Sequence, residues 1–229
     1  MQDKKDNHQH GHRDRLRKRF IESGESALAD YELLELLLFT AIPRKDVKPI
    51  AKDLIATFGT LHKVFTATVD DLCSVKGVSE NTATFLHSVH ALHCRAMKGE
   101  LLQRPVLNNW DRVLAYCHAE LSEEKREQFR VLYLNKKNCL IEDEVHAEGT
   151  IDGANVYARE VMKKAMNIGA TAMILIHNHP SGDPTPSQAD IDLTNQLRDA
   201  SAALNIEIHD HLIISRSGHF SFKSSGLLV

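Results

Sequence analysis

The stretch that decides the fold of this chain reads Ala172-Met173-Ile174-Leu175-Ile176-His177-Asn178-His179. Its residues up to Ile176 are apolar, and a loop rich in proline and glycine follows at 180–186. This pattern predicts a buried strand that ends in a loop. Because residues two apart on a strand point the same way, His177 and His179 share a face and can bind one ion.

Ser187 and Asp190 follow that loop at fixed offsets and extend the constellation. Asp190 falls early in a helix that we expect to start near Pro186, where it can supply a third ligand. A fourth position then remains for water, as catalytic rather than structural zinc requires. Two imidazoles and one carboxylate are ligands that suit zinc. The residues therefore predict a catalytic Zn2+ site with His177, His179 and Asp190 as ligands.

A capping role is the alternative for Ser187 and Asp190, since Ser-x-x-Asp at a helix start is also a capping pattern. Pro186 argues against that role, because proline is favoured at the first helical position. We therefore expect Thr185 to be the N-cap and Gln188 its capping-box partner. This arrangement leaves Ser187 and Asp190 to face the histidines.

The spacing His177-x-His179-x7-Ser187-x2-Asp190 matches in full the JAMM motif of the MPN metalloprotease domain. The surrounding sequence resembles the bacterial RadC branch of that class, through Gly149-Thr150, Arg159-Glu160-Val161 and Asp210-His211-Leu212-Ile213-Ile214. The resemblance covers most of residues 109–229 and extends more loosely to the N-terminal half. It implies a cytidine-deaminase-like architecture in which the two histidines and the aspartate hold zinc, Ser187 stabilises an oxyanion and an earlier glutamate is the general base.

Several glutamates are candidates for that base, and we choose Glu127. It opens the apolar segment 129–134, where the family places its glutamate before the first strand. The other candidates lie in a second strand, a loop or a helix start: Glu142, Glu144, Glu148 and Glu160. The alternative for Glu127 is a solvated acid in the charged run 123–127. The resemblance implies hydrolysis of a peptide or isopeptide bond, whereas the spacing alone implies only a hydrolase.

The composition narrows the class of protein. The chain has 229 residues, which is long enough for two modest domains or one large one, and its 42% of hydrophobic residues support a buried core. A net charge of −3 provides no global attraction to nucleic acid. No apolar run reaches transmembrane length and the start is polar, so we expect a cytoplasmic protein with no membrane partner. The cysteines are widely spaced and indicate neither a disulfide scaffold nor a cysteine zinc site: Cys73, Cys94, Cys117 and Cys139.

The chain divides into two predicted domains, 1–100 and 109–229, because the segment 98–109 interrupts the helical pattern. Upstream, the segments 31–40, 47–58, 61–67, 69–74 and 80–97 all favour helix and predict a small all-α domain. Downstream, we expect a helix at 110–120, strands at 129–134 and 139–146, and then alternating helices and strands. The expected fold class is α/β (α+β), with a mixed sheet flanked by helices in the second domain.

Within the α domain, residues 72–83 resemble the second half of a helix-hairpin-helix unit. Such a hairpin turns backbone N–H groups toward a DNA phosphate without reading sequence. The usual pattern is Gly-hydrophobic-Gly, and this chain has Ser79 at the second glycine. Serine can cap a helix, so we expect the hairpin to form, but without the close approach that glycine allows. A structural helical pair or a protein-docking surface is therefore preferred over DNA binding.

The N-terminal segment carries a basic cluster that consists of Arg13, Arg15, Arg17, Lys18 and Arg19. Such a cluster can contact phosphates or form a solvated helix face. Leu16 and Phe20 are spaced i,i+4, which suits an amphipathic helix packed on the domain. The preceding His8-x-His10-x-His12 is interpreted as an adventitious metal site on a polar terminus.

His209-Asp210-His211 is a second His-x-His pair, in a predicted strand. We rank it below the first pair because no third ligand follows at helical spacing. Asp210 or His211 can instead orient a ligand histidine, since ligating imidazoles donate their other N–H to an acceptor. A purely structural role is the alternative.

Three functions from different classes follow from these observations. The favoured one is a zinc-dependent hydrolase with a peptide or protein substrate. The second is a DNA-associated accessory protein whose helical domain binds DNA, and the third is a metal-free interaction scaffold. No motif specifies an oligomeric state.

Overall fold

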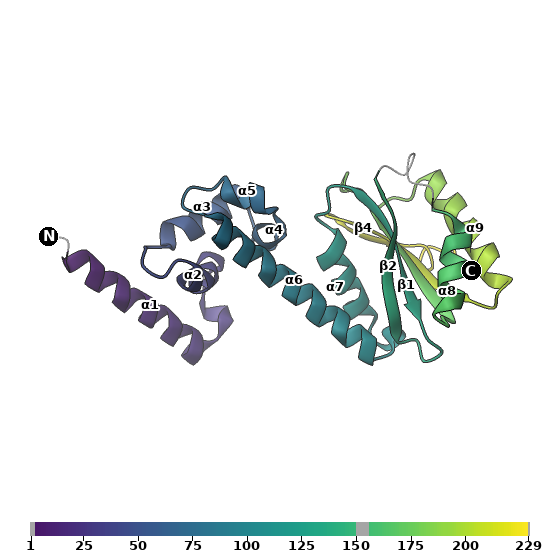
Figure 1. The fold of residues 1–229 in the computed structure, drawn as a ribbon, viewed down its shortest axis with the longest axis horizontal. Helices are drawn as coiled ribbons and strands as arrows, with labels where there is room; N and C mark the ends of the chain where they lie inside the picture. Colours follow the sequence, from purple (N-terminus) through teal and green to yellow (C-terminus); the bar gives the residue numbers. More distant parts are fainter. Residues whose placement is uncertain (1–2, 150–155, 229) are drawn as a thin grey trace. The chain divides into compact units, whose positions relative to one another are not determined.

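The computed structural model describes residues 3–149 and 156–228, with side chains from residue 11 onward (Figure 1). Thr150, His8 and His10 of the patterns above therefore lie outside the described side chains. The chain forms two compact units, Met1–His93 and Cys94–Val229. Every regular element of the first unit is helical among the described residues, and the second contains a mixed sheet, which confirms the predicted fold class.

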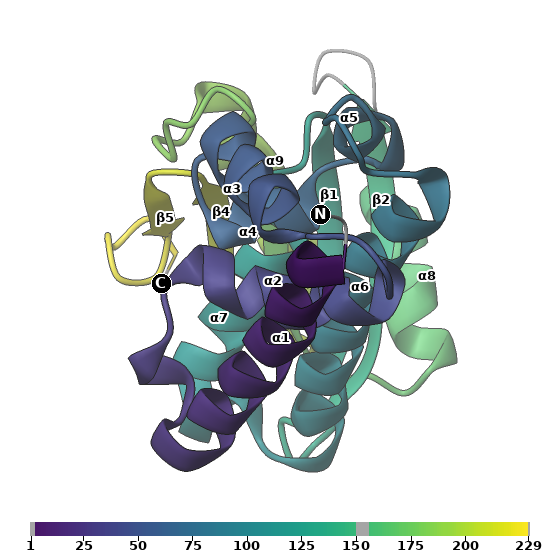
Figure 2. The same cartoon turned by 90° about the vertical axis from the view of Figure 1, so that its left-hand side faces the viewer.

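The first unit is built from short helices around an aliphatic core. Leu34, Leu38, Leu54, Leu72 and Leu86 are fully buried in that core. The helices are α1 (Asp3–Ser23), α2 (Asp30–Ala41), α3 (Lys48–Phe58), α4 (Leu61–Thr66), α5 (Val69–Cys73) and the beginning of α6 (Glu80–Gln103), with a 3-10 turn η1 (Glu25–Ala27) after α1. Helix α1 lies against α2 (Figures 1 and 2).

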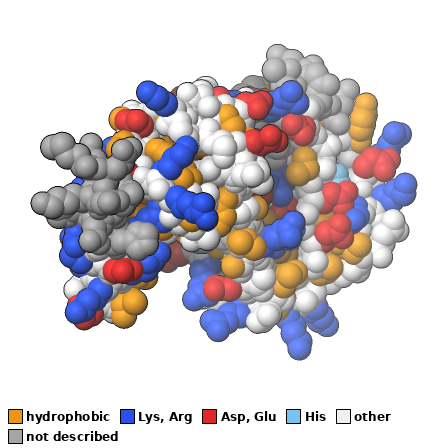
Figure 3. Space-filling view, turned by 60° about the vertical axis from the view of Figure 1, so that its left-hand side comes forward, with side chains coloured by type: hydrophobic (Ala, Val, Ile, Leu, Met, Phe, Trp, Pro, Cys, Tyr) orange, Lys and Arg blue, Asp and Glu red, His pale blue; other side chains and the backbone are white. Residues whose placement is uncertain are grey.

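Four of the five residues of the basic cluster on α1 make polar contacts within this unit. Leu16 is 3% exposed, so the helix does pack on the domain, although Phe20 remains 40% exposed. The guanidinium of Arg13 donates hydrogen bonds to the carbonyls of Phe39, Ile42, Pro43 and Lys45. Arg17 pairs with Asp14, Lys18 with Glu22 and Arg19 with Glu32. On the face drawn in Figure 3, acidic and basic side chains are interspersed. These contacts favour the packed-helix interpretation of the cluster.

The hairpin between α5 and α6 forms as expected. Ser79 Oγ accepts a hydrogen bond from Thr82 N at 3.3 Å, so the serine caps the following helix. Gly77 has φ +93°, and a Cβ there would lie 3.0 Å from Ile50 Cδ1. The backbone conformation therefore favours glycine at 77, and a side chain there would also push against Ile50 of α3.

The interruption predicted at 98–109 is wrong for its first residues, because α6 continues through Gly99 to Gln103, but the helix does end before Arg104 and Pro105. The division between the two units falls inside this helix. Leu101 is buried in the core of the second unit, and Lys98 pairs with the buried carboxylate of Asp143 at 3.6 Å. One glycine costs a helix only about 1 kcal/mol, so these contacts are sufficient to extend it.

The second unit contains a five-stranded sheet with strand order β2-β1-β3-β4-β5. The strands are β1 (Glu127–Leu134), β2 (Leu140–Gly149), β3 (Ala172–Asn178), β4 (Glu207–Ser215) and β5 (Gly218–Ser221). Only β3 and β4 pair in parallel, and the other neighbours are antiparallel. The remaining elements are η2 (Val106–Asn109), α7 (Trp110–Leu121), α8 (Ala158–Asn167) and α9 (Gln188–Ala202).

Helices cover both faces of this sheet (Figure 1). Ile174 and Ile176 pack against α7, whereas Met173 and Leu175 pack on the side of α8 and α9. Every residue of β3 is consequently buried, which explains the uninterrupted apolar run of its sequence. The alternation places His177 on the α9 side and Asn178 on the α7 side.

The sheet register determines where the functional side chains meet. Phe129 of β1 pairs with His177 of β3, so the start of β1 lies beside the end of β3. Helix α9 begins after the loop that follows β3 and carries Asp190 in its first turn. Among the described residues, no helix is both long enough and apolar enough to cross a bilayer.

Candidate metal centre

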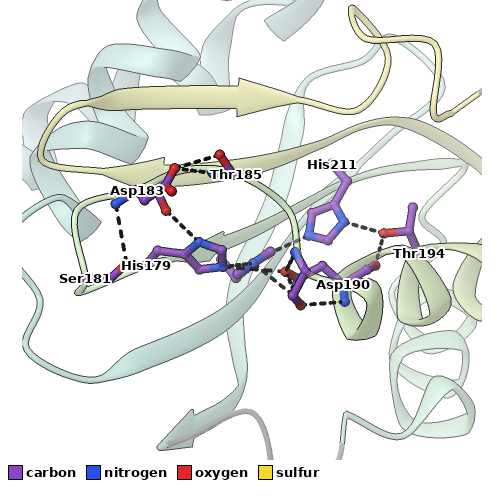
Figure 4. Close-up of polar contacts among 9 residues, drawn as sticks. His179, Ser181, Asp183, Thr185, Asp190, Thr194 and His211 are labelled. Carbon is purple, nitrogen blue, oxygen red and sulfur yellow. Dashed lines mark hydrogen bonds and ion pairs between the residues drawn. The ribbon is translucent and has the colours of Figure 1, made fainter.

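Three side chains meet at the end of β3 (Figure 4). His177 Nε2 lies 3.1 Å from Asp190 Oδ1 and 3.0 Å from His179 Nε2, while His179 Nε2 lies 3.5 Å from Asp190 Oδ2. The ligand atoms of the three residues all lie within 4.8 Å of one another. His177 and Asp190 are each 2% exposed, and His179 is partly buried. The structure thus brings together the three residues that the spacing predicted as ligands.

Hydrogen bonds on the far side of each imidazole determine which nitrogen carries the proton. His179 Nδ1 lies 2.8 Å from the carbonyl oxygen of Asp183, which can only accept. The Nδ1 of His179 must therefore be protonated, and in the neutral ring Nε2 presents a lone pair toward Asp190.

A longer chain of hydrogen bonds determines the tautomer of His177. Thr194 Oγ1 lies 2.5 Å from the carbonyl oxygen of Asp190 and 2.6 Å from His211 Nδ1, and His211 Nε2 lies 2.9 Å from His177 Nδ1. Since the carbonyl only accepts, the hydroxyl donates to it and accepts from His211 Nδ1–H. Complete burial lowers the pKa of His211 well below its ordinary value, so this ring is neutral. His211 Nε2 then accepts from His177 Nδ1–H, which leaves His177 Nε2 unprotonated toward the site.

The donor set therefore fits a divalent cation. Two imidazole lone pairs and a carboxylate face one another, and such a group is repulsive without a positive charge between its members. The hydrogen bond with Asp190 raises the pKa of His179, so a proton can supply that charge. Although burial opposes it, hydrogen bonding with His177 and His179 holds the pKa of the Asp190 carboxyl well below its ordinary value. Tetrahedral Zn2+ binding of two nitrogens and one oxygen matches these groups.

We expect Thr194→Val to lower zinc affinity by about 10- to 100-fold, the effect usual for disturbing the outer partner of a ligand histidine, because Thr194 orients His211 and His211 orients His177. Without the hydroxyl, His211 has no acceptor for its Nδ1 proton and is free to present Nε2–H to His177. The proton of His177 then moves to the nitrogen that should bind the metal.

Competition with a chromophoric chelator measures this affinity. Thr66→Val is the matched control, because it removes a similar hydroxyl-to-carbonyl bond, from Thr66 Oγ1 to His62 O, in the first unit. Equal zinc affinity in Thr194→Val and wild type would show that the chain of hydrogen bonds does not determine the tautomer.

The capping arrangement predicted for α9 is wrong. Ser187, rather than Thr185, is the N-cap, and Asp190 is its capping-box partner. Thr185 is unsuited because its amide and hydroxyl both donate to Asp183 Oδ1. The Asp190 carboxylate combines both roles, since Oδ2 accepts from Ser187 N and Ser187 Oγ at 2.7 Å while Oδ1 faces His177.

A cleft of about 360 Å³ opens beside the three ligands. Its walls include His177, Asp190 and the predicted base Glu127, with apolar side chains such as Phe129 and Leu193. The half-buried Glu127 carboxylate is close enough to His179 that its charge adds to the rise of the His179 pKa, after the larger effect of Asp190.

The other glutamates considered as bases are engaged elsewhere. Glu142 and Glu144 pair with Lys164 at 2.7 and 2.6 Å. Glu148 pairs with Arg126, and Glu160 with Arg159 and Lys163. Among these candidates, Glu127 alone lines the cleft.

Comparison with known proteins identifies the family of this chain. Residues 107–227 match the RadC-like JAB domain family, and residues 8–84 match the UPF0758 N-terminal family. The chain belongs to the RadC family. It is 52% identical over 217 residues to a UPF0758 protein of Ruegeria pomeroyi, an alignment that covers 95% of this chain and 97% of the relative.

The second histidine pair of this RadC chain does not form a metal site of its own. His209 contacts Asn138 and Glu207, away from the ligands. Asp210 accepts from Ser221 Oγ and from the amide of Lys223. Only His211 contacts a ligand, so it fills the orienting role that was considered for this pair.

Two residues of the RadC site were missed by reasoning from sequence, Thr194 and Asn178. Thr194 stands four residues after Asp190, a spacing that places it one helical turn along the same face. That spacing was the available signal. The contacts of Asn178 join segments 50 to 54 residues apart, and nothing local in the sequence indicates them.

Proposed function

We propose that this RadC-family chain is a zinc-dependent hydrolase that cleaves a peptide or isopeptide bond. One observation carries the proposal: two imidazole nitrogens and a carboxylate converge at one end of a cleft that Glu127 also lines. A zinc ion held by His177, His179 and Asp190 would lower the pKa of a water molecule toward 7 and polarise a substrate carbonyl.

The residues of the chain then supply proton transfer and charge stabilisation. Glu127 accepts the proton of the attacking water and delivers it to the leaving nitrogen, as a general base and then a general acid. The Ser187 hydroxyl donates to Asp190 Oδ2, and it would turn that proton toward a developing oxyanion when the carboxylate binds zinc. The apolar side chains in the walls of the cleft would limit the access of water to the reacting groups.

The proposal is tested with full-length protein purified without chelator. We expect one zinc ion per chain by elemental analysis and cleavage of members of an internally quenched library of linear and lysine-linked peptides. Removing zinc with a chelator should abolish cleavage, and adding zinc back should restore it. Protein that takes up no zinc, or zinc-loaded protein that cleaves no member of either peptide class, contradicts the proposal.

A further inference from the structure

Asn178 lies between two of the ligands but points away from them. It is the last residue of β3, it is 1% exposed, and the strand alternation directs its side chain to the face opposite His177. There its amide reaches the segment that leads from α7 into β1. Asn178 Oδ1 accepts from Gln128 N at 2.8 Å, and Asn178 Nδ2 donates to the carbonyls of Arg126 at 3.0 Å and Glu124 at 3.4 Å.

The partners leave only one orientation for this amide. An N–H group requires the oxygen end and two carbonyls require the nitrogen end, so a flipped amide would lose all three bonds. The contacts are made where the backbone ladder stops, since the last pair between β1 and β3 is Phe129 with His177. One side chain therefore continues the strand pairing over a segment that the backbone of β3 does not reach.

These contacts flank Glu127 in the chain, because Asn178 binds the carbonyl of Arg126 before it and the amide of Gln128 after it. We propose that Asn178 is a positioning residue that holds Glu127 at the metal centre. This inference rests on the proposed function, in which Glu127 is the base. With both flanking peptide units fixed, only the side-chain torsions of Glu127 are left to order in the reactive geometry. In this proposal the consecutive residues His177, Asn178 and His179 supply two ligands and, between them, the residue that positions the base.

The test uses binding of acetohydroxamate to the zinc-loaded protein, which requires no substrate and no turnover. A hydroxamate binds zinc beside the general base, and its hydroxyl proton is shared with that carboxylate. We expect Glu127→Gln to weaken acetohydroxamate binding about 10-fold, the effect of one hydrogen bond to a charged group. Asn178→Ala should weaken binding several-fold by misplacing the same carboxylate. In the double variant, Asn178→Ala should add less than about 2-fold to the loss caused by Glu127→Gln, because the two residues act as a unit.

Zinc affinity and a matched variant separate positioning from damage to the fold. We expect Asn178→Ala to bind zinc within about 3-fold of wild type, because the ligands keep the partners His211 and Asp183. Asn135→Ala is the control, since this asparagine also accepts from two backbone amides, those of Lys137 and Cys139, in the turn after β1. It should change neither zinc nor acetohydroxamate binding. If the alanine variant is poorly folded, Asn178→Ser provides the same comparison with a smaller cavity.

The outcomes distinguish this inference from the function on which it rests. Unchanged acetohydroxamate binding in Asn178→Ala, or losses that multiply in the double variant, overturn the positioning role and leave the hydrolase proposal intact. A wild-type protein that takes up no zinc overturns the proposed function and the inference together. Normal zinc and hydroxamate binding without any peptide cleavage overturns the hydrolase proposal and the role of Glu127 as its base, but it leaves the positioning of Glu127 by Asn178 in place.

Discussion

Glu127→Gln is expected to lower the turnover number about 100- to 10,000-fold, the range that a general acid–base group contributes. Glutamine has the same size but cannot accept the proton of water or return it to the leaving nitrogen. Zinc content should stay at one ion per chain, because Glu127 is not among the three converging ligands. Turnover and zinc content measured on the same preparation give the result.

Glu160→Gln is the control for this prediction. Glu160 was also a candidate base, but it is exposed on α8 and pairs with Arg159 and Lys163. Its substitution should change turnover by less than about 2-fold, as for other surface positions. A Glu127→Gln variant that retains wild-type turnover would exclude Glu127 as the general base.

The convergence of His177, His179 and Asp190 could be predicted from sequence because it depends on local geometry. His177 and His179 share a face by strand alternation, and Asp190 is brought back by the short loop between β3 and α9. Local geometry does not locate Glu127, which was chosen only through the family resemblance. Its proximity to His177 depends on pairing between β1 and β3, strands that are about 50 residues apart in the chain.

The errors in the sequence analysis arose where tertiary contacts override a local preference. Gly99 suggested the end of a helix, yet burial of Leu101 keeps α6 intact. Pro186 suggested the first helical residue, yet the hydrogen bonds of Thr185 with Asp183 delay the helix until Gln188. Asn178 could not be assigned at all, because its three partners belong to a different strand end.

Asp190→Asn is expected to reduce bound zinc from one ion per chain to near zero at neutral pH. The substitution removes the only negative charge among the three ligands, so the loss should exceed the roughly 10- to 100-fold caused by losing an outer partner. Elemental analysis after gel filtration measures the loss. Asp199→Asn is the matched control, because Asp199 lies on the same helix, is exposed and pairs with Arg198.

The metal-free proteins should also differ in how their stability depends on pH. The raised pKa of His179 adds stability below its ordinary value of 6.5, and that stability is lost as the pH rises through the raised pKa. The lowered pKa of Asp190 adds stability above its ordinary value of 3.8, and that stability is lost as the pH falls below it. Both contributions are present together near about pH 5, where the melting temperature of metal-free wild type should most exceed that of Asp190→Asn.

At about pH 8 this difference should shrink without metal and reappear when zinc is added, since zinc stabilises only the protein that binds it. Thermal melts at both pH values, with and without zinc, distinguish stabilisation by a proton on His179 from stabilisation by a bound zinc ion. A difference between wild type and Asp190→Asn that is the same at pH 5 and pH 8 without zinc would mean that the carboxylate stabilises the fold through its cap on Ser187 alone. That result would mean that no proton is shared between Asp190 and the histidines. The electrostatic argument for a cation among these three side chains would then fail.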